Sequence, residues 1–278
     1  MSTNQKQTYL NAVDVGFSPL VFQDVNDDVI PFDNSLGTLF VDDFTTLCIG
    51  GYITVGTAHT YNYNHGSAFI DLSVSTLALS NATSGEMVAT LTATQDVEVN
   101  YVAGSNTAAQ VEVSTTAPKS WAVEQRVKVS TIATDAGGFF FGVGTYGSAI
   151  TDTLIDATQL LKTANDFVGF QVAPTAPSTV LAVYKKSSVA DASKGTVVAA
   201  AHTLVASTYV KFGLKYDAVL NKLSYFVNNV AVGSVSGVNA LAAFPTDIKL
   251  VMLISGKTGG GSVAPVITVD WIKSVILK

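Results

Sequence analysis

The chain has little charge for its length, and almost none of its positive charge is arginine. Asp and Glu number 21 and Lys and Arg 15 among 278 residues, which gives a net charge of −6. Arg126 is the only arginine, and the lysines form no cluster. A protein that binds nucleic acid directly needs a basic face to follow the phosphates. The composition therefore argues against a nucleic-acid partner.

Cysteine and long apolar runs are also scarce. Cys48 is the single cysteine, so the chain cannot form an internal disulfide. No apolar run reaches the roughly 18 residues that span a bilayer, and residues 1–15 lack the basic and apolar regions of a secretory signal. We therefore expect a protein that is made in a cytoplasm and has no membrane partner.

Patterns that signal a catalytic or cofactor site are missing as well. Residues 142–147 match a glycine-rich nucleotide motif by letter, but no helix follows to hold a phosphate. A glycosidase on a β-sandwich needs two carboxylates facing one cleft, and Glu124 is followed at the next same-face positions by basic residues. The three histidines are too scattered for a metal site or a triad: His59, His65 and His202. We expect no enzyme activity, no cofactor and no metal.

The segments that are present read as many short β-strands. In the clearest stretch, 208–234, apolar side chains alternate with polar ones from Val210 to Tyr216, which is typical of a strand with one buried face. Asn228 and Asn229 tolerate positive φ and predict a tight turn to a further strand. This stretch therefore predicts a three-stranded β-meander, with its aromatic side chains in the core.

Similar strand patterns recur from residue 38 to the end, separated by Gly, Asn, Ser and Thr clusters. Such a succession predicts an all-β protein, a two-sheet antiparallel jelly-roll sandwich. Whether 38–118 belongs to the same sandwich as the rest is open, although the opening of that segment favours a single sandwich.

Two strand patterns lead to specific expectations about faces. In 121–130, four apolar side chains share one face, and Gln125 falls among them, so we expect Gln125 to have a hydrogen-bond partner there. In the closing segment 266–277, alternation predicts that one face carries Ile267, Val269, Trp271, Val275 and Leu277. Residues 151–165 are the one stretch near helical spacing, and both a helical turn and an irregular loop remain open.

The first 37 residues differ from the rest, being acidic and interrupted by two prolines. We interpret 1–37 as an extended N-terminal arm and 38–278 as the sandwich domain; a frayed tail is the alternative. Isolated apolar residues in the arm need another surface, on the same domain or on a neighbouring subunit. The apolar residues are Phe17, Leu20, Val21, Phe22 and Phe32, and the candidate interaction residues among them are Phe17, Leu20, Phe22 and Phe32.

One aromatic cluster has the composition of a carbohydrate site. Tyr61 and Tyr63 alternate with Asn62 and Asn64 and are followed by His65. Exposed aromatic side chains beside amides can bind a sugar ring. A turn or a subunit contact is the preferred interpretation of this cluster, and a glycan site is the alternative.

Several segments taken in order resemble the concanavalin A-like (laminin-G-like) jelly-roll modules of tailed-phage virion proteins. They are LGTLFVDDF, WAVEQRVKVS, GGFFFGVG, DFVGFQV, STYVKFGLKYDAVLNKLSYFVNNVAV, the Phe244-Pro245 step and VITVDWIKSVIL. The resemblance covers residues 38–278.

The resemblance implies a virion structural protein, most simply a capsid decoration (cement) protein. Its partners would be the major capsid protein and further copies of itself, as a homo-oligomer and most simply a trimer. It would lie on the capsid surface after synthesis in the host cytoplasm. Charged residues make up 13% of the chain, about half the usual 25%, which also favours a subunit of an assembly. The alternative is a glycan-binding module of a tail or fibre protein.

Overall fold

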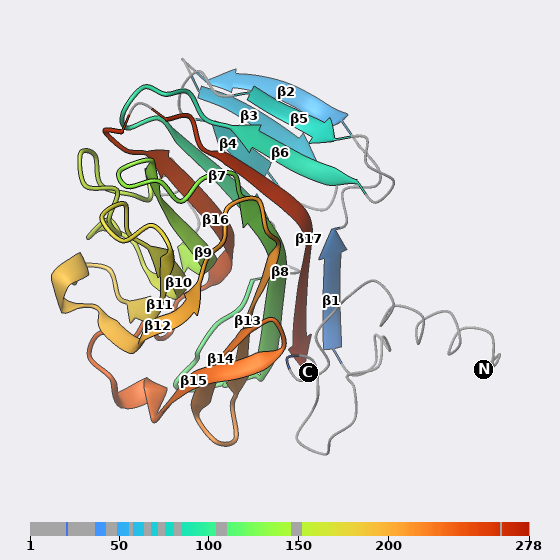
Figure 1. The fold of residues 1–278 in the computed structure, drawn as a ribbon. Helices are drawn as coiled ribbons and strands as arrows, with labels where there is room; N and C mark the ends of the chain where they lie inside the picture. Colours follow the sequence, from blue (N-terminus) through green and yellow to red (C-terminus); the bar gives the residue numbers. More distant parts are fainter. Residues whose placement is uncertain are drawn as a thin grey trace.

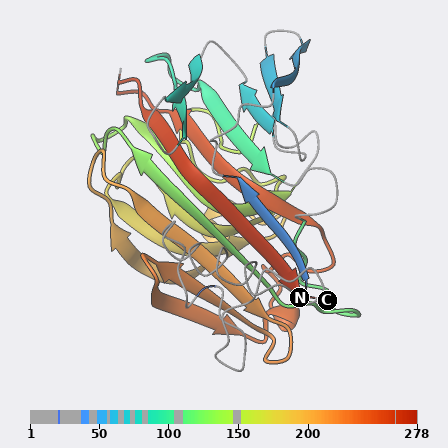
Figure 2. The same ribbon diagram turned by 90° about the vertical axis from the view of Figure 1, so that its right-hand side faces the viewer.

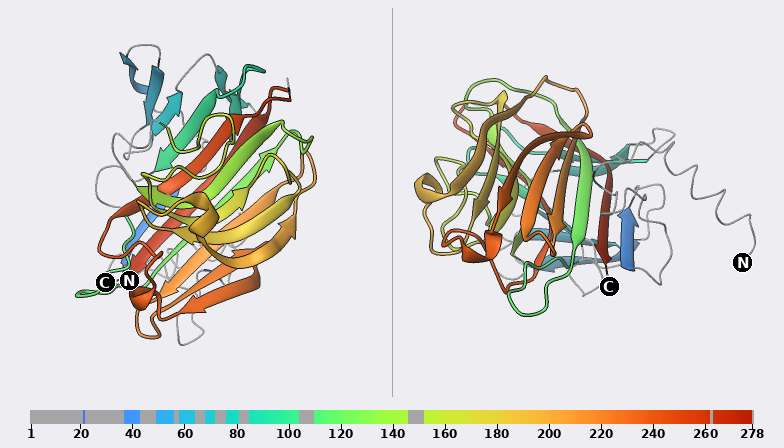
Figure 3. Two further views of the ribbon diagram at one scale, coloured as in Figure 1. Left: turned by 90° about the vertical axis from the view of Figure 1, so that its left-hand side faces the viewer. Right: turned by 90° about the horizontal axis from the view of Figure 1, so that it is seen from below.

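A computed structural model gives the fold of most of the chain. The residues it describes are Val21, 37–42, 49–55, 58–63, 68–71, 76–80, 85–103, 110–145, 152–261 and 263–277, with side chains at Val21 and from residue 85 onward. Two β-sheets face one another, and every strand pairing in them is antiparallel (Figures 1 and 3). The predicted all-β jelly-roll sandwich is therefore confirmed.

The first sheet contains eight strands. They are β1 (Gly37–Asp42), β5 (Thr76–Ser80), β6 (Glu86–Thr90), β8 (Trp121–Val129), β13 (Val210–Asp217), β14 (Lys222–Val227), β15 (Val230–Ser236) and β17 (Val266–Leu277). Their order is β15-β14-β13-β8-β17-β6-β5, and β1 also pairs with β17.

The second sheet contains nine strands. They are β2 (Ile49–Val55), β3 (Ala58–Tyr63), β4 (Ala68–Asp71), β7 (Glu98–Ala103), β9 (Gly137–Thr145), β10 (Phe167–Val172), β11 (Thr179–Lys185), β12 (Gly195–Thr203) and β16 (Leu250–Thr258). Their order is β12-β11-β10-β9-β16-β7-β4-β3-β2. Among the residues that the structure describes are two short 3₁₀ helices, Asp191–Ser193 and Val238–Ala240.

The two halves of the chain share this sandwich. Strand β6 pairs with β17, and β7 pairs with β16, so strands from before residue 118 lie beside the last two strands of the chain. Strands from both parts of the chain therefore belong to the same two sheets.

The β-meander forms as predicted and supplies much of the core between the sheets. Phe212 on β13 is buried and stacks on Phe141 of β9, with ring centroids 5.1 Å apart, and its ring lies 4.8 Å from that of Phe170 on β10. Asn228 and Asn229 both have positive φ, 50° and 65°, at the turn between β14 and β15. Phe212, Tyr216 and Tyr225 of this stretch are core residues, as predicted. Phe226 instead packs on the outer face of the sheet, and Tyr209 is only partly buried.

The expectation for Gln125 is wrong. Its side chain lies among the core residues of β8 with 3% exposure, and its Oε1 accepts no hydrogen bond from any described residue. A gap beside it, lined by Phe170, Phe212 and Met252 among others, has no room for a water molecule. The core therefore contains a buried amide oxygen without a hydrogen-bond partner among the described residues.

The face predicted for the closing strand is also wrong, because β17 contains a β-bulge. The register against β8 shifts between Val269 and Trp271. Ile267 before the bulge and Ile272 after it both belong to the core, whereas Val275 packs on the opposite side of the sheet. An extra residue in a strand reverses the alternation beyond it.

One residue of the predicted arm packs on the outer face of the eight-stranded sheet, the side seen in Figure 2. Val21 is fully buried against Ala122, Phe226 and Val275. Gly213 leaves room for it, since a Cβ at that position would lie 2.7 Å from Val21 Cγ2. The other predicted arm residues lie outside the described residues: Phe17, Leu20, Phe22 and Phe32.

Candidate functional site

The most elaborate polar site among the described residues lies on the outer face of the nine-stranded sheet, under an irregular segment. Residues 152–166, here called the strap, lead into β10 and cross this face (Figure 3, left). The strap contains no helix, so the irregular alternative is correct. In its tight turn the Ile155 N–H donates to the Leu160 carbonyl and the Gln159 N–H donates to the Ile155 carbonyl. This turn holds Ala157 and Gln159 at positive φ of 60° and 49°.

The strap is anchored to the sheet partly by apolar side chains. Leu154 and Leu161 are fully buried against Phe140 of β9 and Phe167 of β10. The rings of these two phenylalanines meet edge to face, with centroids 5.0 Å apart. Phe140 points outward while its neighbours in β9 point into the main core, which explains why this strand is apolar throughout.

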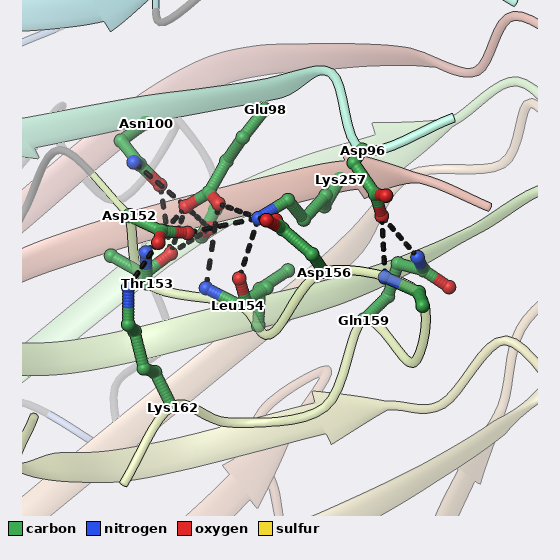
Figure 4. Close-up of polar contacts among 12 residues, drawn as sticks. Asp96, Glu98, Asn100, Asp152, Thr153, Leu154, Asp156, Gln159, Lys162 and Lys257 are labelled. Atoms are coloured by element: carbon green, nitrogen blue, oxygen red, sulfur yellow. Dashed lines mark hydrogen bonds and ion pairs between the residues drawn. The ribbon is translucent and has the colours of Figure 1, made fainter. Parts of the chain in front are cut away.

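Polar side chains occupy the neighbouring part of the same face (Figure 4). Glu98 and Asn100 are two residues apart on β7 and therefore point to one side. In the register with β16, Glu98 is opposite Lys257 and Asn100 is opposite Ser255. We call these four side chains the sheet cluster. They are at most 2% exposed.

The strap places the Thr153 hydroxyl at the centre of the sheet cluster. Thr153 Oγ1 donates to Glu98 Oε1, shares a hydrogen bond with Ser255 Oγ and lies 3.0 Å from Asn100 Oδ1. The backbone N–H of Thr153 also donates to Glu98 Oε1, at 2.7 Å. Three side chains from two strands thus converge on a single hydroxyl group.

The strap also brings two carboxylates to the ammonium group of Lys257. Lys257 Nζ lies 2.9 Å from Asp152 Oδ1, 2.5 Å from Asp156 Oδ1 and 3.0 Å from Glu98 Oε2. It also donates to the carbonyl oxygen of Leu154, at 2.6 Å. Burial by itself lowers the pKa of Lys257, but the three carboxylates outweigh burial and raise it above its ordinary value. Lys257 is therefore a cation at neutral pH.

Both oxygens of Glu98 are engaged. Oε1 accepts from Thr153 and from Asn100 Nδ2, at 2.9 Å, and Oε2 faces Lys257. Burial raises the pKa of Glu98, while Lys257 and the hydrogen bonds act in the opposite direction. A carboxylate enclosed in this way can hold a hydroxyl and a cation in place, but it has no free lone pair directed at water.

Further polar contacts tie the strap to the sheet or hold its shape. Asp96 Oδ1 accepts from the Ala157 N–H at 2.7 Å and from Gln159 Nε2 at 2.9 Å. Asp152 pairs with Lys162 within the strap. Partial burial acts to raise the pKa of Asp152, but its bonds to Lys162 and Lys257 prevail and lower it.

Gln171 of β10 is a further polar side chain on this face. Its Nε2 donates to Asp191 Oδ1 at 3.0 Å, and the same oxygen accepts from the Leu161 N–H of the strap at 3.1 Å. Gln171 is 1% exposed, and its Oε1 has no hydrogen-bond partner among the described residues.

The aromatic cluster expected as an interaction site lies on β3, outside the site formed by β7, β16 and the strap. Tyr61 and Tyr63 belong to β3, where Tyr61 pairs with Phe69 and Tyr63 with Ile49. Only the backbone of this strand is described, so the role of both tyrosines stays a prediction.

The sheet cluster was not predicted from the sequence. The only signal was Glu98 and Asn100, two residues apart in a strand pattern. The other half of the site depends on β16 and the strap, which are distant in sequence. No group of His, Cys, Asp and Glu suited to hold a metal is found within the described part of the chain. The same residues include no helix long and apolar enough to cross a membrane.

Comparison with known proteins identifies relatives in fold only. No protein-family model and no curated protein matches the chain. Among solved structures, a protein of unknown function from Shewanella oneidensis MR-1 is similar over 100% of this chain and 95% of its own, at 14% identity and a TM-score of 0.56.

Two further structures carry a functional description. The Emp47p carbohydrate recognition domain is similar over 88% of this chain and 98% of its own, at 10% identity and a TM-score of 0.54. An endo-1,3-β-glucanase from Streptomyces sioyaensis is similar over 90% of this chain and 100% of its own, at 12% identity and a TM-score of 0.50. At these identities the likeness is one of fold, the concanavalin A-like jelly roll.

Proposed function

We propose that this protein is a carbohydrate-binding module and that its ligand lies on the outer face of the nine-stranded sheet. The observation that carries the proposal is the convergence of Glu98, Asn100 and Ser255 on the hydroxyl of Thr153. A carboxylate, an amide and a hydroxyl together offer the acceptors and donors that a sugar hydroxyl requires. Phe140 and Phe167 lie beside them, covered by Leu154 and Leu161 of the strap, and a sugar ring in the place of these leucines would pack on an apolar surface.

The fold comparisons support the same class of ligand by analogy. One of the described relatives is a carbohydrate recognition domain and another hydrolyses a glucan, according to their names. Fold similarity alone does not determine function. The analogy adds weight because the polar side chains of this chain gather on one sheet face.

The geometry supports binding in preference to hydrolysis. Glycoside hydrolysis needs one carboxyl group to exchange a proton and a second to act on the opposite side of the bond. Glu98 is 1% exposed, and both of its oxygens are occupied. Asp152 and Asp156, the other two carboxylates at this site, are both paired with Lys257.

A glycan array followed by calorimetry on the hits tests the proposal. Asn100→Ala should weaken binding about tenfold, the equivalent of one lost hydrogen bond of about 1.4 kcal/mol. Ser224→Ala in β14, on the other sheet, is the matched control and should bind as the wild type does. Tyr61→Ala and Tyr63→Ala test the aromatic cluster in the same assay. Absence of any glycan hit at millimolar concentration would contradict the proposal.

A virion role is the second candidate, either as a module of a tail or fibre or as a capsid decoration protein. The weakly charged surface, 13% charged residues overall, supports burial in an assembly with copies of itself or with a major capsid protein. Mixing the protein with empty capsids and imaging them by cryo-electron microscopy tests this role. Capsids without added density would count against the decoration role.

A further inference from the structure

The strap presents two chemical groups to the sheet side by side. Thr153 offers a hydroxyl to Glu98 and Ser255, while Asp152 and Asp156 offer carboxylates to Lys257. The carboxylates come from the residue before Thr153 and from the third residue after it. The strap therefore makes the contacts that a small hydroxylated acid would make at the same place.

Stability alone does not account for this arrangement. Replacing buried ion pairs by apolar side chains of similar volume is often neutral or stabilising, so a purely structural strap could be held by more residues like Leu154 and Leu161. Instead the strap is held in part by charge, and it keeps Ala157 and Gln159 at positive φ, which costs conformational energy. Long irregular connections of this kind are frequently functional.

Displacement of the strap would leave the sheet with a specific electrostatic requirement. Lys257 would lose the carboxylates of Asp152 and Asp156 and keep only that of Glu98, whose Oε1 would lose Thr153. A ligand that replaces the strap must therefore supply an anionic group to Lys257 and a hydroxyl to Glu98. A neutral sugar would meet only the second requirement.

The strands also align further side chains on this face, beyond Lys257 and Glu98. Asn100 is opposite Ser255, Ser255 is opposite Phe140, and Phe140 is opposite Gln171, so all four lie in one row across the face. Gln171 Oε1, buried and without a partner among the described residues, lies at the far end of the row. A ligand longer than one sugar would reach an aromatic ring and then an available acceptor.

We propose that the ligand is an acidic saccharide, whose carboxylate takes the place of Asp152 and Asp156 at Lys257 while a ring hydroxyl takes the place of Thr153 Oγ1. The strap is then an internal competitor that occupies the site until the saccharide displaces it. This inference rests on the proposed carbohydrate-binding function and adds the ligand class and its regulation. Apparent affinity is reduced by the fraction of molecules whose strap is closed, so weakening the strap tightens binding.

Two variants weaken the strap without changing the sheet cluster. Thr153→Val keeps the side-chain shape and removes the hydroxyl. Asp156→Asn removes one strap carboxylate whose side chain is 70% exposed, so its effect on folding should be small. Asp135→Asn, at an exposed turn outside the strap, removes the same charge and is the matched control.

The probes are trigalacturonic acid, trimannuronic acid and 3′-sialyllactose, each with a neutral counterpart: trigalacturonic acid methyl ester, trimannose and lactose. Calorimetry should show that an acidic probe binds the wild type at least tenfold more tightly than its neutral counterpart does. The affinity for the acidic probe should rise by a further threefold or more in Thr153→Val and in Asp156→Asn, but not in the control Asp135→Asn. Hydrogen exchange of the strap amides, Thr153, Leu154 and Ala157 among them, should become faster when the acidic probe binds.

The remaining outcomes separate this inference from the proposed function. Equal binding of acidic and neutral probes, or binding that leaves strap exchange unchanged or slower, would overturn the acidic ligand and the displaced strap, while carbohydrate binding would stand. If no probe binds to the wild type or to either strap variant and the array is also blank, the proposed function fails and this inference fails with it.

Discussion

Replacing Gln125 by methionine should make the protein more stable, although it removes a polar group from the middle of a strand. The side chain is 3% exposed, and its Oε1 has no hydrogen-bond partner among the described residues. A buried amide without compensation costs about 1–3 kcal/mol. Methionine has a similar volume and no oxygen to desolvate, and its flexibility suits the gap beside Phe170 and Phe212.

The expected gain is therefore about 1–3 kcal/mol in the free energy of unfolding. For a domain of this size, 2 kcal/mol corresponds to a rise of about 4–8 °C in Tm. Urea unfolding followed by tryptophan fluorescence measures the free energy, and scanning calorimetry measures Tm. An unchanged m-value would show that the gain comes from the folded state.

Gln171→Met is the matched control, because the same substitution has a different environment there. Gln171 Oε1 also lacks a partner, but its Nε2 donates to Asp191, which is itself buried. We expect Gln171→Met to be neutral or destabilising, since a buried carboxylate loses a donor. If Gln125→Met proved less stable than the wild type, the reasoning about the uncompensated amide would be refuted.

Three other predictions concern packing and pH. Gly213→Ala should expel Val21 from its slot, because a Cβ there would lie 2.7 Å from Val21 Cγ2; limited proteolysis should then cleave the N-terminal segment faster, with Tm falling only slightly. Phe212→Ala should cost about 3–5 kcal/mol by urea unfolding, and a loss below 1 kcal/mol would contradict its place in the core. Burial lowers the pKa of Lys185 to about 8 from 10.5, so the unfolded state binds more protons between these values and stability should rise with pH across that window. Lys185→Met should remove this rise in unfolding experiments at pH 8 and pH 10, and an identical pH dependence in the variant would exclude Lys185 as its source.

The sequence predicted features that depend on neighbouring residues. Alternation from Val210 to Tyr216 placed β13 correctly, and the Asn228–Asn229 pair identified the turn between β14 and β15, because both signals are local. The closing strand failed at a single point, since nothing in its residues marks the bulge between Val269 and Trp271. A bulge is fixed by the partner strand, whose register a single sequence does not reveal.

The candidate site depends even more on contacts between distant segments, which a single sequence does not reveal. Glu98, Thr153 and Lys257 come from three distant segments, and only the register of β7 with β16 and the path of the strap bring them together. The sequence pattern points to Glu124 as the candidate for a paired carboxylate and gives no comparable sign at Glu98. Polar side chains that alternate with apolar ones are typical of a strand with one solvent-exposed face, so β7 itself gives no sign that the strap covers Glu98 and Asn100.

The pairing of β1 with β17 has a consequence for how the chain folds. Gly37 is opposite Leu277, so this pairing closes a loop of almost the whole described chain. The entropy of loop closure grows only with the logarithm of length, which makes the contact affordable at equilibrium. Folding rates, however, fall as contacts join more distant residues. Joining residue 277 to residue 37 through a short turn and opening the chain elsewhere would turn the most distant contact into a local hairpin, and the permuted protein would reach the same fold by a faster route.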